Sequence, residues 1–252
     1  MSYQSIFRRY EIKYLLTEDQ YCTVRRAMEP YMEADRYGRS SVRNIYYDTE
    51  SYRLIRRSME KPVYKEKLRL RSYGAVSEDG DVFVELKKKY KGVVYKRRIA
   101  LPYPAAVRWL EGGVPTAPPT QISREIDYFR EYYGRLLPQV YLSYEREAFA
   151  LRGGGDLRIT FDREILARED DVSLCGERYG RTILPEGLLL MEIKCGGGMP
   201  LWMSEVLCAN RIYRCSFSKY GRAYEDIIFP RINNNTIQED KYDVSGSFSR
   251  NF

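Results

Sequence analysis

Basic side chains recur at every second position in several segments whose composition favours β-strands. In a strand, alternate residues share one face, so the stretch KEKLRLR at 65–71 turns its basic side chains one way and its leucines the other. The basic residues on such faces are Arg9, Lys13, Lys65, Lys67, Arg69, Arg71, Lys87, Lys89, Lys96, Arg98, Arg158 and Lys194. A few carboxylates share these faces, namely Glu11, Glu85, Asp162 and Glu192. Guanidinium and ammonium groups bind phosphate oxygens, so the pattern indicates phosphate chemistry.

Two arrangements of the strands are compatible with this alternation. An ordinary antiparallel sheet, with its apolar face inward and its charges in water, explains any one of the segments. It explains several neighbouring strands less well, because like charges there repel by about 4 kcal/mol per close pair at an effective dielectric of 20. A bound polyanion would relieve that repulsion. We therefore expect a barrel whose polar face encloses phosphates and whose apolar face is covered by helices.

Strand and helix signals alternate along the chain in a way that is typical of an α+β fold. We expect strands at 7–15, 42–48, 65–73, 81–90, 93–101, 139–151, 156–166 and 188–195. We expect helices after the capping pair Thr17 and Gln20, and at 104–112, 123–134, 200–213 and 218–228. Many short strands with a few helices predict a closed antiparallel β-barrel with flanking helices.

The glycine runs and the C-terminal segment complete this organisation. The runs at 153–155 and 196–198 fit neither a P-loop nor a dinucleotide-binding pattern, so we interpret them as turns. A kinase of the P-loop or protein-kinase type is therefore disfavoured. Residues 1–230 are expected to form one domain, and the polar stretch 231–252 is expected to be a disordered tail.

The absence of histidine limits the possible reactions. It excludes Ser-His-Asp and Cys-His nucleophilic sites and every histidine-ligated metal. A metal must then be held by oxygen ligands, which favours Mg²⁺ or Mn²⁺. The five cysteines include no CxxC pair, which argues against a zinc cluster and a disulfide framework.

The overall charge favours an anionic partner. The net charge of +7 suits a nucleotide, polyphosphate, nucleic acid or membrane surface. Nucleic-acid binding is disfavoured, because no expected helix concentrates the basic residues and no RRM-type motif accompanies the 24 tyrosines. No apolar run approaches the ~20 residues that a bilayer crossing needs, and the charged N-terminus does not resemble a signal peptide. We expect a soluble, cytoplasmic protein.

Several short segments, taken in order, resemble the VTC (vacuolar transporter chaperone) domain of the triphosphate tunnel metalloenzymes, or CYTH superfamily. The segments are YEIKY at 10–14, NIYYDT at 44–49, LRLRSYG at 68–74, VFVELK at 82–87, YEREAF at 144–149, LRITFDRE at 157–164, LMEIK at 190–194 and FSKYGRA at 217–223. This resemblance implies an antiparallel β-barrel tunnel with flanking helices.

The resemblance also implies an activity and a site. Catalytic VTC members transfer the terminal phosphate of ATP to a growing inorganic polyphosphate chain with a divalent metal, Mn²⁺ or Mg²⁺. The phosphate-binding residues would be Lys13, Arg69, Arg71, Lys87, Lys96, Arg158, Lys194, Ser218 and Lys219, and the metal ligand would be Glu192. Family members can assemble with membrane proteins, so a membrane partner is compatible with this chain.

One departure from the superfamily bears on the choice of reaction. Triphosphatases and adenylyl cyclases begin with ExExK, whereas this chain has arginine at the first acidic position, in RYEIK at 9–13. That change disfavours a two-metal hydrolase of short triphosphates and leaves the role of Glu11 open. A non-catalytic polyphosphate or anion sensor is the other alternative. Glu192 counts against it, because an anion receptor gains nothing from a negative charge in its site.

Overall fold

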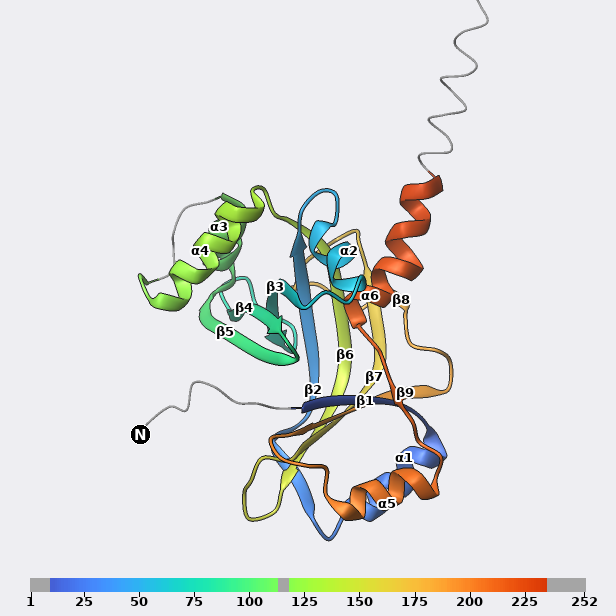
Figure 1. The fold of residues 1–252 in the computed structure, drawn as a ribbon. Coiled ribbons are helices and arrows are strands. Elements are labelled where there is room, and N and C mark those ends of the chain that lie inside the picture. The colour runs from blue at the N-terminus through green and yellow to red at the C-terminus, as the bar shows by residue number, and fades with distance from the viewer. Residues whose placement is uncertain (1–9, 113–117, 235–252) are drawn as a thin grey trace, which may run out of the picture.

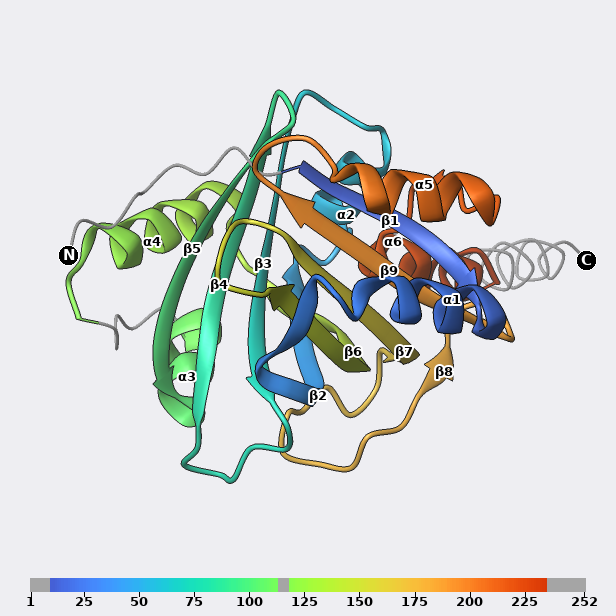
Figure 2. The ribbon, with the colours of Figure 1, turned by 90° about the horizontal axis from the view of Figure 1, so that it is seen from below.

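A computed structural model describes residues 10–112 and 118–234, and it shows one large curved antiparallel sheet with helices packed outside it (Figures 1 and 2). The strands are β1 (Tyr10–Thr17), β2 (Met32–Asp48), β3 (Tyr64–Tyr73), β4 (Asp81–Tyr90), β5 (Val93–Pro102), β6 (Leu137–Leu151), β7 (Arg158–Arg168), β8 (Arg181–Thr182), β9 (Leu188–Cys195) and β10 (Arg214–Cys215). The helices are α1 (Glu18–Met28), α2 (Arg53–Met59), α3 (Tyr103–Gly112), α4 (Gln121–Tyr133), α5 (Leu201–Ala209) and α6 (Lys219–Ala223), which continues through a π-helical turn, η1 (Tyr224–Ile228).

The order of the strands confirms the α+β class but corrects the expectation of a closed barrel. The order is β10-β1-β9-β7-β6-β2-β3-β4-β5, with β8 paired to β7. Within the described residues, no backbone pairing joins the β10 end to β5, so the sheet is open. β10 is only two residues long and offers few backbone groups for a further ladder. Side chains cross the opening instead, because Lys87 Nζ on β4 lies 3.0 Å from Glu11 Oε2 on β1.

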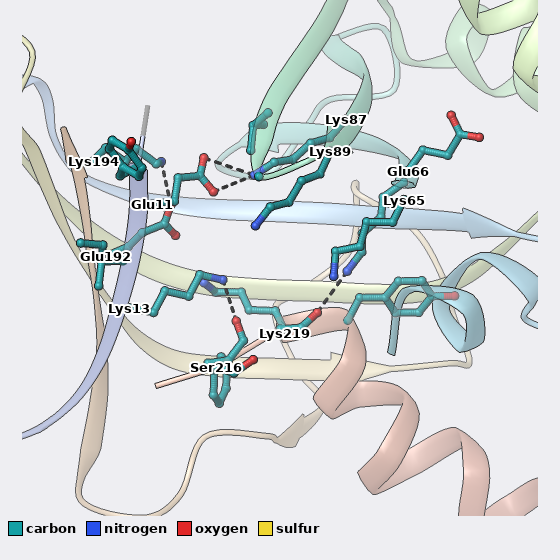
Figure 3. A pocket seen from close by; sticks show the side chains of 18 of the residues that line it. Glu11, Lys13, Lys65, Glu66, Lys87, Lys89, Glu192, Lys194, Ser216 and Lys219 are labelled. Carbon is teal, nitrogen blue, oxygen red and sulfur yellow. Dashed lines mark hydrogen bonds and ion pairs between the residues drawn. The ribbon is translucent and has the colours of Figure 1, made fainter. Parts of the chain in front are cut away.

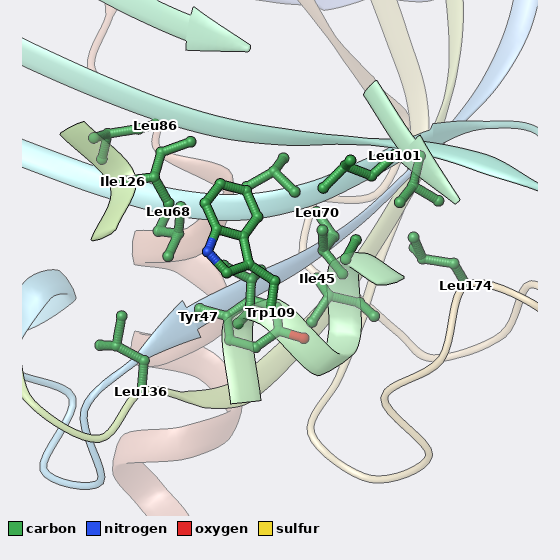
Figure 4. Packing of buried hydrophobic residues seen from close by; sticks show 14 of the residues in the cluster. Ile45, Tyr47, Leu68, Leu70, Leu86, Leu101, Trp109, Ile126, Leu136 and Leu174 are labelled. Carbon is green, nitrogen blue, oxygen red and sulfur yellow. The ribbon is translucent and has the colours of Figure 1, made fainter. Parts of the chain in front are cut away.

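The apolar outer face of β3, β4 and β5 packs against α3 and α4. Leu68 and Leu70 of β3 are fully buried there, beside Trp109 of α3 and Ile126 of α4 (Figure 4). Burial of each such side chain stabilises the fold by about 1.5–3 kcal/mol. The leucines of KEKLRLR therefore face the helices, and the basic residues between them face the hollow of the sheet.

A second layer covers the outer side of β1, β7 and β9. It contains α1 and α5, with Val24, Met28, Met203 and Leu207 packed in one buried cluster. The expected capping box begins α1, because Gln20 N donates to Thr17 Oγ1 at 3.3 Å and Thr17 N donates to Gln20 Oε1 at 3.1 Å. The helix therefore starts where the sequence placed it.

Helix α2 was not expected, and its N-terminus explains why. Its N-cap, Tyr52, makes no side-chain capping bond. The main acceptor is instead Asp48, the buried last residue of β2, whose carboxylate accepts from Leu54 N at 2.8 Å and Ile55 N at 2.9 Å, while Thr49 Oγ1 accepts from Arg53 N at 2.9 Å. Tyr220 of α6 donates to the same carboxylate at 2.9 Å. One buried aspartate thus ties the strand to two helices.

Other boundaries differ from the expectations in detail. β2 begins at Met32, ten residues before position 42, and accommodates a bulge in its pairing with β6. α5 ends at Ala209, and the C-terminal helix continues to residue 234. The glycines at 153–155 form the expected turn, with φ of 71°, 92° and 129°. The expectations for Arg9 and for the tail beyond residue 234 lie outside the described residues.

No helix in the described ranges combines the length and the apolar character that a bilayer crossing requires.

Candidate phosphate-binding site

The hollow of the sheet contains a cavity of about 800 Å³ with a strongly basic lining. Side chains of β1, β3, β4, β6 and β9 converge on it, together with the segment from β10 to α6 (Figure 3). The lining cations are Lys13, Lys65, Lys67, Arg69, Arg71, Lys87, Lys89, Lys91, Arg146, Lys194, Arg214 and Lys219. The lining carboxylates are Glu11, Glu66 and Glu192. The alternating faces of the strands therefore meet around one cavity.

Most of the expected site residues line this cavity. They are Lys13, Arg69, Arg71, Lys87, Glu192, Lys194, Ser218 and Lys219. Arg158 does not line it, because it stands at the start of β7 and pairs with Asp35 of β2. Lys96 of β5 does not line it either, and its Nζ lies 2.7 Å from Glu85 Oε1. The structure thus leaves these two expected residues outside the cavity.

Arg69 is held by three hydrogen bonds to side chains of β2 and β4. Its Nε and Nη2 donate to Glu85 Oε2 at 2.9 and 2.7 Å, and its Nη1 donates to the Tyr46 hydroxyl at 3.1 Å. Burial would raise the pKa of Glu85, but the guanidiniums of Arg69 and Arg71 hold it well below its usual range. Glu85 is therefore a permanent anion beside this part of the cavity wall.

Arg71 lies next to it and is held by neutral groups. Its Nε donates to Asn44 Oδ1 at 2.8 Å, and its Nη2 donates to the Tyr144 hydroxyl at 3.0 Å. Both of these partners are neutral, although Arg71 Nε also lies 3.9 Å from Glu85 Oε2. Arg71 can therefore direct much of its positive charge to an anion in the cavity.

A second buried carboxylate orients two further cations of the wall. Asp162 of β7 is fully buried and accepts from Arg146 Nε at 2.6 Å and Nη2 at 2.8 Å. Its Oδ2 also lies 2.6 Å from Lys219 Nζ. Burial would raise the pKa of Asp162, but Arg146 and Lys219 lower it to about 2. This carboxylate fixes both side chains without lining the cavity.

The first strand brings lysines and carboxylates together. Lys13 lies opposite Glu192, and Glu11 lies opposite Lys194, in the pairing of β1 with β9. Lys194 Nζ lies 3.0 Å from Glu192 Oε1. Burial would raise the pKa of Glu192, but Lys194 and Lys13 hold it well below its usual range. Glu192 is therefore ionised, as a metal ligand must be.

The segment before α6 closes the cavity on one side. Ser218 caps α6 by accepting from Gly221 N at 3.2 Å, and the same hydroxyl lies 3.1 Å from Lys67 Nζ. Lys13 Nζ donates to the Phe217 carbonyl at 2.6 Å. Burial lowers the pKa of Lys67 to about 8 and also lowers the pKa of Lys13. These lysines are partly buried and would gain from a bound anion.

The carboxylates in the cavity fit a metal that is shared with phosphate. Mg²⁺ typically takes one or two carboxylates and completes its shell with phosphate oxygens and water. Burial and the nearby charge of Glu192 would raise the pKa of Glu11, but Lys87 and Lys194 lower it below its usual range. In residues 10–112 and 118–234, no group of three acidic or cysteine side chains is placed to hold a metal alone. These two residues therefore fit an ion that arrives with its phosphate ligand.

The sequence reasoning missed several residues of the wall. Tyr46, Tyr144 and Arg146 line the cavity but were given no role, and Lys67 was expected on a basic face without being assigned to the site. Tyr144 and Arg146 carry a detectable signal, because they alternate along β6 inside the YEREAF segment. Tyr46 carries none, since a tyrosine between apolar residues is typical of a core strand.

Comparison with known proteins gives one family match. The model of the VTC domain matches residues 8–228. A search of curated proteins found no match.

Solved structures give weaker likenesses. A candidate adenylate cyclase from Bacillus halodurans is 16% identical, with a TM-score of 0.49, over 84% of this chain and 95% of its own. One from Vibrio parahaemolyticus is 13% identical, with a TM-score of 0.44, over 87% and 98%. One from Hippeastrum, described as having a dominant triphosphatase activity, is 16% identical, with a TM-score of 0.49, over 86% and 95%.

Proposed function

Because the chain belongs to the VTC domain family, we propose that it is a metal-dependent polymerase that transfers the terminal phosphate of ATP to a growing polyphosphate chain. The observation that carries this proposal is the cavity wall, where basic side chains from separate strands far outnumber the carboxylates. Such a wall is self-repelling when empty and complementary to a chain of phosphates.

The arrangement of lysines on β3 and β4 favours a polymer over a short triphosphate. Lys65 lies directly opposite Lys89, and Lys67 lies directly opposite Lys87. Like charges in such positions destabilise a sheet. Among the described residues, Lys65, Lys67 and Lys89 have no carboxylate within ion-pair distance, and Lys87 pairs with Glu11, so the four lysines are only partly neutralised from within the protein. This lysine ladder extends the cationic surface beyond the region of Arg69 and Arg71.

The reaction requires no nucleophile from the protein. A terminal oxygen of the acceptor chain attacks the γ-phosphorus of ATP, a new P–O bond forms, and the bond to the β-phosphate oxygen breaks, releasing ADP. Catalysis then depends on alignment of the two substrates and on neutralisation of charge. Arg69, Arg71 and Arg146 supply guanidinium donors for phosphate oxygens, and Lys13, Lys87 and Lys194 supply compact positive charges.

A divalent metal would be held by Glu192, with Glu11 beside it, and by phosphate oxygens. When bound, Mn²⁺ or Mg²⁺ would neutralise part of the phosphate charge. Lys194 and Lys87 hold these two carboxylates in the ion pairs described above, and each lysine would be available to phosphate if its carboxylate held the metal.

The test is chain growth by purified protein supplied with ATP and Mn²⁺, followed by electrophoresis of the product. Wild-type protein is expected to form long polyphosphate. Arg69→Ala and Arg146→Ala are expected to lower the rate by about a hundredfold or more, because each removes a donor held at the cavity wall. Arg158→Ala, whose side chain lies outside the cavity, is the matched control and should retain the rate.

Other products would identify a different function. Release of orthophosphate without chain growth would assign the cavity to triphosphate hydrolysis. Metal-independent binding of polyphosphate without turnover would make the protein a sensor. Loss of activity in Arg158→Ala with retention in Arg146→Ala would contradict the assignment of the wall.

A further inference from the structure

Glu85 of β4 is a buried anion at the centre of a cationic group. Its side chain is 1% exposed, and it does not line the cavity. Oε2 accepts from Arg69, and Oε1 accepts from Arg98 Nε at 2.6 Å and lies 2.7 Å from Lys96 Nζ. Arg69 and Arg98 are its direct neighbours in the pairing of β3, β4 and β5. One carboxylate thus connects three strands behind the wall.

The hydrogen bonds of Arg69 determine which of its donors remain for a ligand. A guanidinium carries five N–H groups. Glu85 takes one from Nε and one from Nη2, and the hydroxyl of Tyr46 takes one from Nη1. Two remain, one on each terminal nitrogen, and N–H groups on the two terminal nitrogens can together bind two oxygens of one phosphate. Because Glu85 binds the edge of the guanidinium formed by Nε and Nη2, it fixes the direction in which the remaining N–H groups point.

We propose that Glu85 is a positioning residue for phosphate binding, which holds Arg69 so that its remaining N–H groups face the cavity. This proposal rests on the proposed function only in requiring that phosphate binds there. Glu85 does not itself touch the substrate, since it lies behind Arg69. Its effect on the ligand is therefore indirect and passes through the orientation of Arg69.

A simple charge effect and a positioning role for Glu85 predict opposite changes in polyanion affinity when Glu85 is neutralised. The change Glu85→Gln removes one negative charge near the cavity without changing the size of the side chain. If Glu85 only offsets neighbouring cations, the more positive wall should bind a polyanion more tightly. If Glu85 positions Arg69, the guanidinium loses the charged oxygen that accepts from both its Nε and its Nη2, and the polyanion should bind more weakly.

The experiment measures tripolyphosphate affinity by titration calorimetry at fixed salt, for wild-type protein and Glu85→Gln. We expect binding to weaken by about tenfold or more. The matched control is Glu125→Gln, because Glu125 pairs with Arg97 and Lys88 on the outer face of the same strands. The control should bind like wild-type protein. Thermal melting verifies that each variant is folded.

A double-mutant cycle separates positioning from a general structural effect. In an Arg69→Ala background, Glu85→Gln should cause no further weakening, because the residue through which it acts is gone. Glu85→Asp retains the charge but is one methylene too short to keep both contacts. Glu85→Asp should also bind tripolyphosphate weakly. If the glutamine variant does not fold, this variant tests whether Glu85 positions Arg69.

The possible failures are distinct. If Glu85→Gln or Glu85→Asp binds as tightly as wild-type protein or more tightly, the positioning role is wrong while the proposed function stands. If the effects of Glu85→Gln and Arg69→Ala add, Glu85 does not act through Arg69. If wild-type protein binds no tripolyphosphate, both the proposed function and this inference fail.

Discussion

Two side chains in the cavity wall have pKa values close to physiological pH. Lys67 is shifted down to about 8 by burial and by the neighbouring charges of Lys13, Lys65 and Lys87. For Tyr46, burial would raise the pKa, but Arg69, Lys67 and Arg71 lower it to about 7. Both groups become more negative when they lose a proton. The charge of the empty cavity therefore falls as pH rises through this interval.

We expect the affinity for tripolyphosphate to fall as pH rises from about 7 to above 8. A bound anion favours protonated Lys67 and protonated Tyr46, so both pKa values are higher in the complex than in the free protein. Binding is then strongest when the pH lies below the pKa values of the free protein. It weakens as the pH rises and levels off once the pH exceeds the pKa values of the complex. Titration calorimetry across this range, in buffers of different ionisation enthalpy, would also detect the protons taken up on binding.

Because tripolyphosphate also changes its protonation with pH, variants of Lys67 and Tyr46 provide the control. Lys67→Arg replaces the titrating ammonium with a group that remains charged. Tyr46→Phe removes the phenol. Each variant should reduce the pH dependence of affinity relative to wild-type protein, whereas the contribution of the ligand stays the same. Identical pH profiles for all three proteins would show that neither side chain titrates in this range.

At the scale of elements, the period of two in β3 is the most informative pattern in the sequence. It correctly assigned Leu68 and Leu70 to the helix-covered face and Arg69 and Arg71 to the cavity. The assignment worked because a strand constrains every second side chain, whatever the rest of the fold does. Capping at Thr17 was equally local and was equally well predicted.

The expectations that failed depended on long-range contacts. Arg158 lies on the face expected from its strand, but its distance from the cavity depends on where β7 begins, and Asp35 holds it there. The cap of α2 comes from Asp48, at the end of the preceding strand. Closure of the sheet depends on the extent of β10. Neither local propensity nor alternation contains that information.

The lysine ladder leads to a prediction about ligand length. In the double variant Lys65→Gln, Lys89→Gln, affinity for long polyphosphate should fall by about tenfold or more, because two charge-assisted contacts are lost. Affinity for tripolyphosphate should change little, since a short ligand can stay near Arg69 and Arg71. Parallel titrations with the two ligands measure the difference.

The control for this experiment lies on β4 and on the neighbouring strand β5. Lys88 and Arg97 point to the outer face, where they pair with Glu125. The double variant Lys88→Gln, Arg97→Gln removes the same number of charges without altering the cavity, so it should bind both ligands like wild-type protein. Equal losses for long and short ligands in the Lys65 and Lys89 variant would argue against a polymer path along the ladder.

At the scale of the molecule, the cavity lies between two ends of an open sheet. The β3–β4–β5 unit is anchored to α3 and α4, whereas β1 and β9 are anchored to α1 and α5 (Figure 2). Across the opening, Lys87 and Glu11 form an ion pair that is partly exposed. Exposed pairs contribute about 0–1 kcal/mol, so this contact holds the two ends together only weakly. A polyanion that contacts Lys13, Lys87 and Lys194 would connect them more firmly.

Ligand binding should therefore stabilise the whole protein and slow amide exchange most at the opening. Tripolyphosphate at about 100 times its dissociation constant adds about 2.7 kcal/mol, or roughly 5–11 °C in Tm for a domain of this size. In hydrogen-exchange mass spectrometry, locally exchanging amides of β1 and β4 should gain the most protection. The amides of α4 provide the internal comparison, because that helix packs on the far side of β5 and contributes nothing to the cavity wall. Uniform slowing in α4 and β1 would mean that the ligand stabilises the fold without joining its two halves.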